Sequence, residues 1–207
     1  RFLRVVTLRP IAPESALDGV LRSAVVPSLL DDRRVLDVWI GRHGTRDDQA
    51  RVVASTWTDE PVSASGEPID LATLRSLGAG VAAVEDVEQA PLSVHARFER
   101  SEPTRILRVF HGQVHPGELD RYIELARTGM LADATAYGGL IAFALAARPP
   151  EAFTTVSAWT GWPAIEAATG GNTRQPFMTR NAQLLETFSV KHYEVLPDAA
   201  DRSRRRP

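Results

Sequence analysis

The sequence repeats itself at a spacing of about 100 residues, and this repeat restricts the possible folds more than any other feature of the chain. Leu3-Arg4-Val5-Val6 recurs as Leu107-Arg108-Val109-Phe110, and Ser55-Thr56-Trp57-Thr58 recurs as Ser157-Ala158-Trp159-Thr160. Three further matches keep the same order, and only the loops between them change length. A repeat at a fixed spacing indicates a structural unit that occurs twice.

Each half of the chain predicts the same element order, strand, helix, strand, strand, helix, strand. The expected strands are Phe2–Arg9, Val35–Arg42, Ala50–Thr58 and Leu92–Glu99 in the first half, and Arg105–Val114, Leu140–Ala147, Phe153–Thr160 and Ser189–Leu196 in the second. Helices are expected to begin near Pro13, Pro61, Pro116 and Pro163, because proline suits the first turn of a helix. This order is that of the ferredoxin-like unit.

The expected domains are two ferredoxin-like repeats, residues 1–100 and 101–197, and a disordered basic tail over residues 198–207. Consecutive apolar residues such as Val52-Val53-Ala54 indicate a sheet that is buried on both faces. The expected fold class is therefore α+β, with two βαββαβ repeats packed sheet to sheet as an intramolecular α+β barrel around an apolar cavity. Such a chain is a monomer with an internal pseudo-dimer, and a further homodimer stays open.

Composition excludes several classes of function. Lys and Arg number 24 against 26 Asp and Glu, so the net charge of -2 predicts no nucleic-acid partner. The absence of cysteine excludes disulfides and thiolate metal sites. No apolar run is long enough for a membrane span, which predicts no membrane partner. No basic segment followed by an apolar stretch opens the chain, so a cytoplasmic location is expected.

Two strands end in Ser55-Thr56-Trp57 and Ser157-Ala158-Trp159, each before a predicted short helix, and the chain closes with the strand Lys191–Leu196. Gly138-Gly139 precedes the second strand of the second half. These motifs resemble the antibiotic-biosynthesis-monooxygenase family of the dimeric α+β barrel superfamily. The family's barrel is usually built by two chains, so a tandem repeat would build it within one chain.

The resemblance implies cofactor-independent oxygenation of quinol-like aromatic substrates, as in some members, or oxidative haem breakdown, as in others. Haem chemistry is disfavoured, because no histidine lies on the predicted helix after Trp57 or Trp159 and the family's first-strand asparagine is missing. We therefore expect no cofactor and a small aromatic or polyketide-like substrate in the barrel cavity. The alternative is a catalytically inert barrel that binds a small ligand or a protein partner.

His111 is the expected catalytic base. It stands in a strand of the second half, where the first half has Thr7, as expected if one cavity diverged after duplication. Histidine can accept a phenolic proton at neutral pH, and cofactor-free oxygenation requires the substrate anion. His111 and His115 lie roughly 13 Å apart along a strand, so they cannot share one metal ion. We expect no metal site.

The expected substrate-binding residues surround this base. They are Trp57, Trp159, Tyr137, Asn172, Arg174 and Gln113. The resemblance implies that the tryptophans line the cavity, although each could instead pack as a core aromatic. The polar residues lie near element ends, where a barrel mouth is expected, and the glycine-containing loop Gly170–Pro176 is a candidate lid.

Overall fold

Eight strands are described in the computed structural model, which covers residues 1–207 except 12, 44–48, 61–79, 99–100, 137 and 197–207. The strands are β1 (Phe2–Pro10), β2 (Val35–His43), β3 (Arg51–Trp57), β4 (Ala82–Arg97), β5 (Ile106–Val114), β6 (Leu140–Arg148), β7 (Ala152–Trp159) and β8 (Leu185–Val195). Their hydrogen-bonded order is β1-β3-β2-β8-β5-β7-β6-β4, and the fold is of the expected mixed α+β class.

The chain forms two compact units, which we describe separately. Unit 1 comprises Arg1–Gln89 and Tyr193–Pro207, and unit 2 comprises Ala90–His192. The long strands β4 and β8 each contribute one part to unit 1 and the other part to unit 2.

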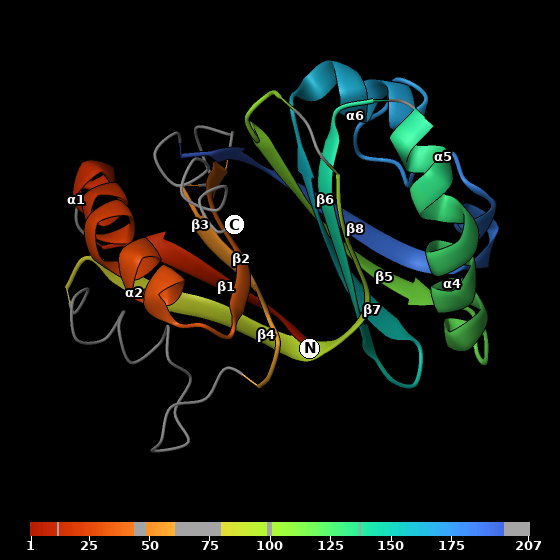
Figure 1. The fold of residues 1–207 in the computed structure, drawn as a ribbon, viewed down its shortest axis with the longest axis horizontal. Helices are drawn as coiled ribbons and strands as arrows, with labels where there is room; N and C mark the ends of the chain where they lie inside the picture. Colours follow the sequence, from red (N-terminus) through yellow and green to blue (C-terminus); the bar gives the residue numbers. More distant parts are fainter. Residues whose placement is uncertain (12, 44–48, 61–79, 99–100, 137, 197–207) are drawn as a thin grey trace. The chain divides into compact units, whose positions relative to one another are not determined.

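Unit 1 has the strand order β4-β1-β3-β2-β8, with antiparallel pairing at its centre. The first part of β4 lies beside β1, where Arg9 pairs with Glu85, and the end of β8 pairs with β2. One helical run covers one face of this sheet (Figure 1). The run consists of α1 (Glu14–Val20), the π-helical segment η1 (Leu21–Val25) and α2 (Val26–Asp31). Apolar residues from the run and from β1, β2 and β3 form the core of the unit.

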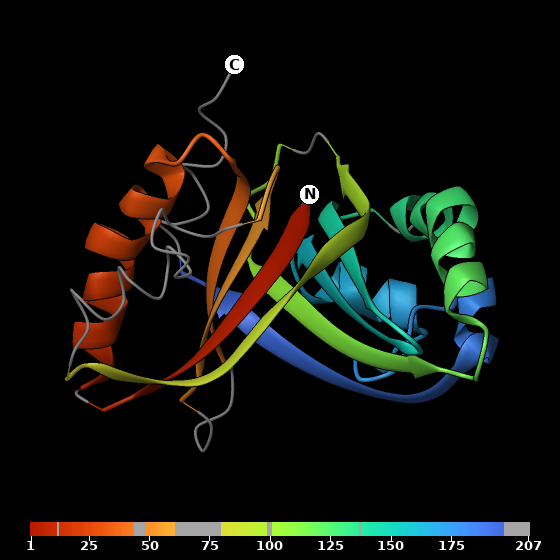
Figure 2. The ribbon, with the colours of Figure 1, turned by 90° about the horizontal axis from the view of Figure 1, so that it is seen from below.

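Unit 2 has the strand order β8-β5-β7-β6-β4 and a corresponding helical run. The run consists of α4 (Leu119–Leu125), the π-helical segment η2 (Ala126–Met130) and α5 (Leu131–Ala136). It lies against one face of the unit-2 strands (Figure 2), and we call this the helix face. The remaining helices of the unit are α6 (Trp162–Thr169) and the 3-10 segment η3 (Arg180–Leu184).

The central strands lie close to their expected positions, but the long strands differ. β4 begins at Ala82, ten residues before the expected start at Leu92, and β8 begins at Leu185 rather than Ser189. The added part of β4 is exposed and carries Glu85 and Asp86, so it lacks the apolar pattern that indicates a strand. The turn 44–48, the helix expected at Pro61 and the tail 198–207 lie outside the described residues.

Gly112 in β5 permits close packing of aromatic rings. A Cβ atom at this position would collide with the Phe153 ring and lie 2.9 Å from Cε1 of Phe110. We expect Gly112→Ala to lower the free energy of unfolding by about 1–3 kcal/mol, because neither buried ring can move freely. Urea denaturation measures this change. Gly19→Ala is the control, since nothing lies within 4 Å of its added Cβ, and an equal loss there would contradict the packing argument.

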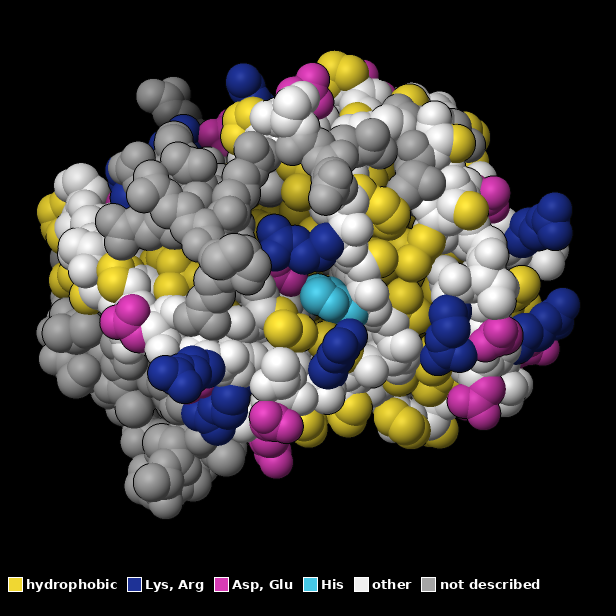
Figure 3. Space-filling model, viewed as in Figure 1, with side chains coloured by type: hydrophobic (Ala, Val, Ile, Leu, Met, Phe, Trp, Pro, Cys, Tyr) yellow, Lys and Arg dark blue, Asp and Glu magenta, His cyan; other side chains and the backbone are white. Residues whose placement is uncertain are grey.

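No helix in the described part of the chain is long and apolar enough to cross a membrane. On the face shown in Figure 3, the basic and acidic side chains of the described residues are interspersed.

Candidate functional site

The side chains of β5 alternate between the two faces of the unit-2 sheet. Ile106 and Phe110 belong to the core beneath the helices, and Trp159, the cross-strand partner of Ile106, lies there too. Arg108, midway between Ile106 and Phe110, therefore shares the helix face. His111 is five residues from Ile106 and lies on the opposite face.

The structure does not bring His111 and Trp159 to one cavity wall. His111 is half-buried, and its Nδ1 lies 3.3 Å from Oγ1 of its cross-strand partner Thr154. Gln113, on the same face as His111, is exposed. Trp159 is fully buried on the helix face, where its Nε1 donates a 2.9 Å hydrogen bond to Oγ of Ser157.

The other expected binding residues also lie apart. Trp57 is buried in the core of unit 1, and its Nε1 donates to Oγ of Ser55 at 2.8 Å. Asn172 and Arg174 are exposed in a turn, where Oδ1 of Asn172 accepts a hydrogen bond from the Arg174 backbone N–H at 3.1 Å. Tyr137 lies outside the described residues.

A small cavity lies on the helix face of unit 2. Its lining residues are Arg108, Phe110, Tyr122, Met130, Phe143 and Thr155 from strands and helices, and Pro176, Phe177, Thr179, Asn181, Ala182 and Leu185 from the segment leading into β8. The space open to the centre of a water molecule is about 20 Å³. A cavity of this size holds about one water molecule or one small polar group.

Arg108 is the charged residue of this cavity, and it is 2% exposed. Its Nη2 donates a 2.6 Å hydrogen bond to the backbone oxygen of Gln175, and its Nε has no hydrogen-bond partner among the described residues. Its guanidinium carbon lies 4.6 Å from the ring centre of Phe177 and 5.1 Å from that of Phe110. These cation–π contacts stabilise the charge only partly, so Arg108 retains donor capacity for an anion.

Burial shapes the ionisation of both polar groups that face each other here. Burial lowers the pKa of Arg108 to about 10, and the interaction with Tyr122 opposes this shift. The guanidinium therefore stays charged at neutral pH. Burial also raises the pKa of the Tyr122 hydroxyl, against the effect of the Arg108 charge. Tyr122 is thus a neutral hydrogen-bond donor, and the pair favours an anionic oxygen in the cavity.

Sequence reasoning singled out neither Arg108 nor Tyr122 as a site residue. Tyr122 and Met130 were recognisable as part of the apolar stripe of a helix, and both are buried as that pattern predicts. The available signal for Arg108 was an arginine inside an apolar strand, repeated at Arg4. The loop expected to be a lid does reach the cavity, since Gln175 binds Arg108 and Pro176 lines the wall.

Several solved structures share this fold. A provisionally assigned monooxygenase from Lactobacillus acidophilus is 8% identical, with a TM-score of 0.63 over 95% of this chain and 94% of that one. An anthrone oxidase-like protein is 13% identical, with a TM-score of 0.54 over 94% and 91% of the two chains. A haem-binding protein from Thermus thermophilus is 8% identical, with a TM-score of 0.56 over 98% and 93%.

These likenesses show the fold alone, because identity is so low. No family profile matches the sequence. No curated protein matches it either. Among the residues that the structure describes, no three His, Asp or Glu side chains come together as a group that could hold a metal ion.

Proposed function

We propose that this protein is a cofactor-independent, monooxygenase-like enzyme for a small aromatic substrate, with its active site at the helix-face cavity of unit 2. The buried Arg108 guanidinium, which has an unpartnered Nε and no carboxylate partner among the described residues, is the observation that carries this proposal. A lone buried cation is costly to the fold. Such a group beside a cavity is a candidate for ligand binding.

The chemistry follows from the charge. Cofactor-free oxygenation needs a substrate anion that can donate an electron to dioxygen. Arg108 and the neutral Tyr122 hydroxyl would lower the pKa of a phenolic or enolic substrate by stabilising its oxyanion. For an activated CH2 group the reaction balances as CH2 plus O2 giving C=O plus H2O, with the substrate as the reductant. Phe110 and Phe177 supply apolar walls for an aromatic ring.

We further infer that the two units are repeats of one module and that their sheets together form a barrel. Both units place a π-helical segment at the same point of the helical run, at Leu21–Val25 and at Ala126–Met130. Both tryptophans donate to the serine two residues earlier. The core strand orders β4-β1-β3-β2 and β8-β5-β7-β6 also correspond.

Haem, which one structural neighbour binds, does not fit this cavity. The space of about 20 Å³ is far smaller than a porphyrin needs, and no histidine lies among the described residues that line it. The proposal therefore contains no step that involves haem.

Oxygen uptake over a panel of hydroquinones tests the proposed function. We expect the wild-type protein to consume oxygen with at least one of them, and Arg108→Met to slow uptake about 100-fold, as for loss of a donor to a developing oxyanion. His111→Ala should leave the rate unchanged, because His111 lies on the other face of the sheet. The absence of uptake with every hydroquinone contradicts the proposal.

The same assay separates the proposal from the hypothesis that His111 is the base. If His111→Ala abolishes uptake while Arg108→Met does not, the reaction occurs on the opposite face of the sheet. His111 is half-buried beside Thr154, so a ligand on that face could reach it.

A further inference from the structure

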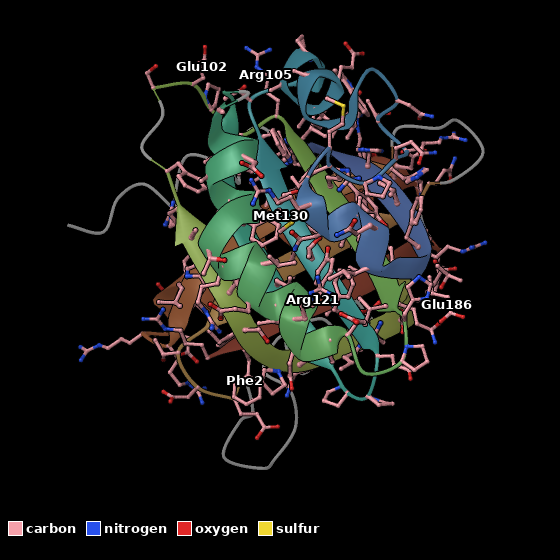
Figure 4. All side chains as sticks on the ribbon, turned by 90° about the vertical axis from the view of Figure 1, so that its right-hand side faces the viewer. Phe2, Glu102, Arg105, Arg121, Met130 and Glu186 are labelled. Carbon is pink, nitrogen blue, oxygen red and sulfur yellow. The ribbon has the colours of Figure 1, made fainter. Side chains whose placement is uncertain are left out.

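Two hollows of unit 2 share a wall. The inner hollow is the cavity at Arg108, and the outer one is a surface groove between the helical run α4–α5 and η3. Met130 and Asn181 line both. Figure 4 shows Met130 where the green helical run meets the blue segment η3. These two side chains are therefore the partition between the groove and the cavity.

The two hollows differ greatly in size. The groove offers about 320 Å³ by the same measure that gives about 20 Å³ for the inner cavity. The larger value lies at the low end of the range for small-molecule sites, whereas the smaller one suits a single water-sized group. A ligand that uses both hollows would keep its body in the groove and extend one small group to Arg108.

We propose that Met130 is a gate and that the site takes an aromatic acid or phenol, whose body lies in the groove and whose single ionised oxygen passes Met130 to reach Arg108. This inference rests on the proposed function only in using the same cavity. Met130 is 4% exposed, and Asn181 is 2% exposed. Asn181 is held by a 3.1 Å hydrogen bond from its Nδ2 to the backbone oxygen of Tyr122, so Met130 is the movable half of the partition.

The local backbone and side-chain chemistry support a gate at this position. Met130 is the last residue of the π-helical segment η2, and such segments inside α-helices often mark functional sites. Methionine has three rotatable bonds and adapts to different shapes. In unit 1 the corresponding π-helical segment ends at the shorter, branched Val25, which lacks this freedom.

The groove suits a largely uncharged body. Leu125 and Met130 give it apolar surface, and Thr128 gives it a hydroxyl. Arg180 and Asp133, both exposed, carry opposite charges. The groove therefore has no net charge that would attract a second ionised group, and the only buried charge lies beyond the gate at Arg108.

4-Fluorobenzoate is a suitable probe, and fluorine NMR of the full chain measures its affinity and exchange rate. We expect Met130→Ala to raise the dissociation rate about tenfold with a smaller change in affinity. Thr128→Trp, at the exposed groove wall, should weaken binding about tenfold by filling the space for the ring. Met178→Ala and Arg121→Trp are matched controls that line neither hollow, and both should behave as wild type. Figure 4 labels Arg121 on the same helical run.

The outcomes are decisive even if Met130→Ala does not fold, because Thr128 is exposed and its replacement leaves the core intact. Wild-type exchange and affinity in both Met130→Ala and Thr128→Trp would overturn the gate, as would a wild-type protein that does not bind 4-fluorobenzoate. If the expected binding pattern appears but no hydroquinone supports oxygen uptake, the gate stands and the proposed enzymatic function fails.

Discussion

Replacing Arg108 with methionine is expected to weaken 4-fluorobenzoate binding about 100-fold while leaving the fold at least as stable as the wild type. The loss of affinity follows from removing charge-assisted hydrogen bonds in a buried cavity. Stability is expected to stay equal or to rise by about 1 kcal/mol, because an apolar side chain replaces a buried cation that has no carboxylate partner among the described residues. Fluorine NMR titration and urea denaturation measure the two quantities.

Arg4→Met is the matched control. Arg4 occupies the corresponding position of unit 1 and is equally buried, but its Nη1 donates a 2.6 Å hydrogen bond to Oε1 of Gln89. Removing Arg4 should lower the free energy of unfolding by about 1 kcal/mol, because it breaks that bond, and should leave binding unchanged. A large loss of stability in Arg108→Met with normal binding would instead assign Arg108 a structural role.

The pH dependence of binding is a second readout for Arg108. Affinity should be constant from about pH 6 to 9 and fall as the pH rises through about 10, the lowered pKa of Arg108. The folded-state pKa lies below the ordinary value of 12.5, so the unfolded state holds this proton more tightly. Arg108 therefore opposes folding at neutral pH, and its penalty decreases as the pH rises through this interval. An inflection between about pH 6 and 7 would implicate a histidine.

The strands could be predicted from the sequence because their signal is local. Apolar runs bounded by proline and glycine placed β1, β5, β6 and β7 within about two residues of their observed bounds. The first part of β4 could not be predicted, since its exposed charged residues do not form an apolar pattern. Strand pairing with β1 stabilises that part instead, as between Arg9 and Glu85.

The site was harder to predict because it depends on which face each strand residue occupies. The sequence favoured His111 because the two halves differ there, while Arg108 matched its counterpart Arg4 and so looked like part of the shared framework. Only the pairing of Ile106 with Trp159 shows that Arg108 and Trp159 share one face and that His111 does not. A shift of one residue in this register would reverse the faces.

Asp18→Ala is expected to lower the free energy of unfolding by about 3 kcal/mol, because it removes the main partner of another buried arginine. Arg51 is 1% exposed, and its Nε donates a 2.7 Å hydrogen bond to Oδ1 of Asp18. Burial alone would lower the pKa of Arg51, but hydrogen bonds to Asp18 and Glu14 raise it above the ordinary value. Arg51 thus shows the paired state that Arg108 lacks, and here a carboxylate of the chain itself neutralises the charge.

Glu14→Ala is the matched control, measured by urea denaturation at the same pH. The Glu14 carboxylate also binds Arg51 at 2.7 Å, but its side chain is 44% exposed, so its loss should lower the free energy of unfolding by less than about 1 kcal/mol. Equal losses in the two variants would mean that burial does not decide the strength of these ion pairs. The contrast drawn between Arg51 and the ligand-binding Arg108 would then lose its physical basis.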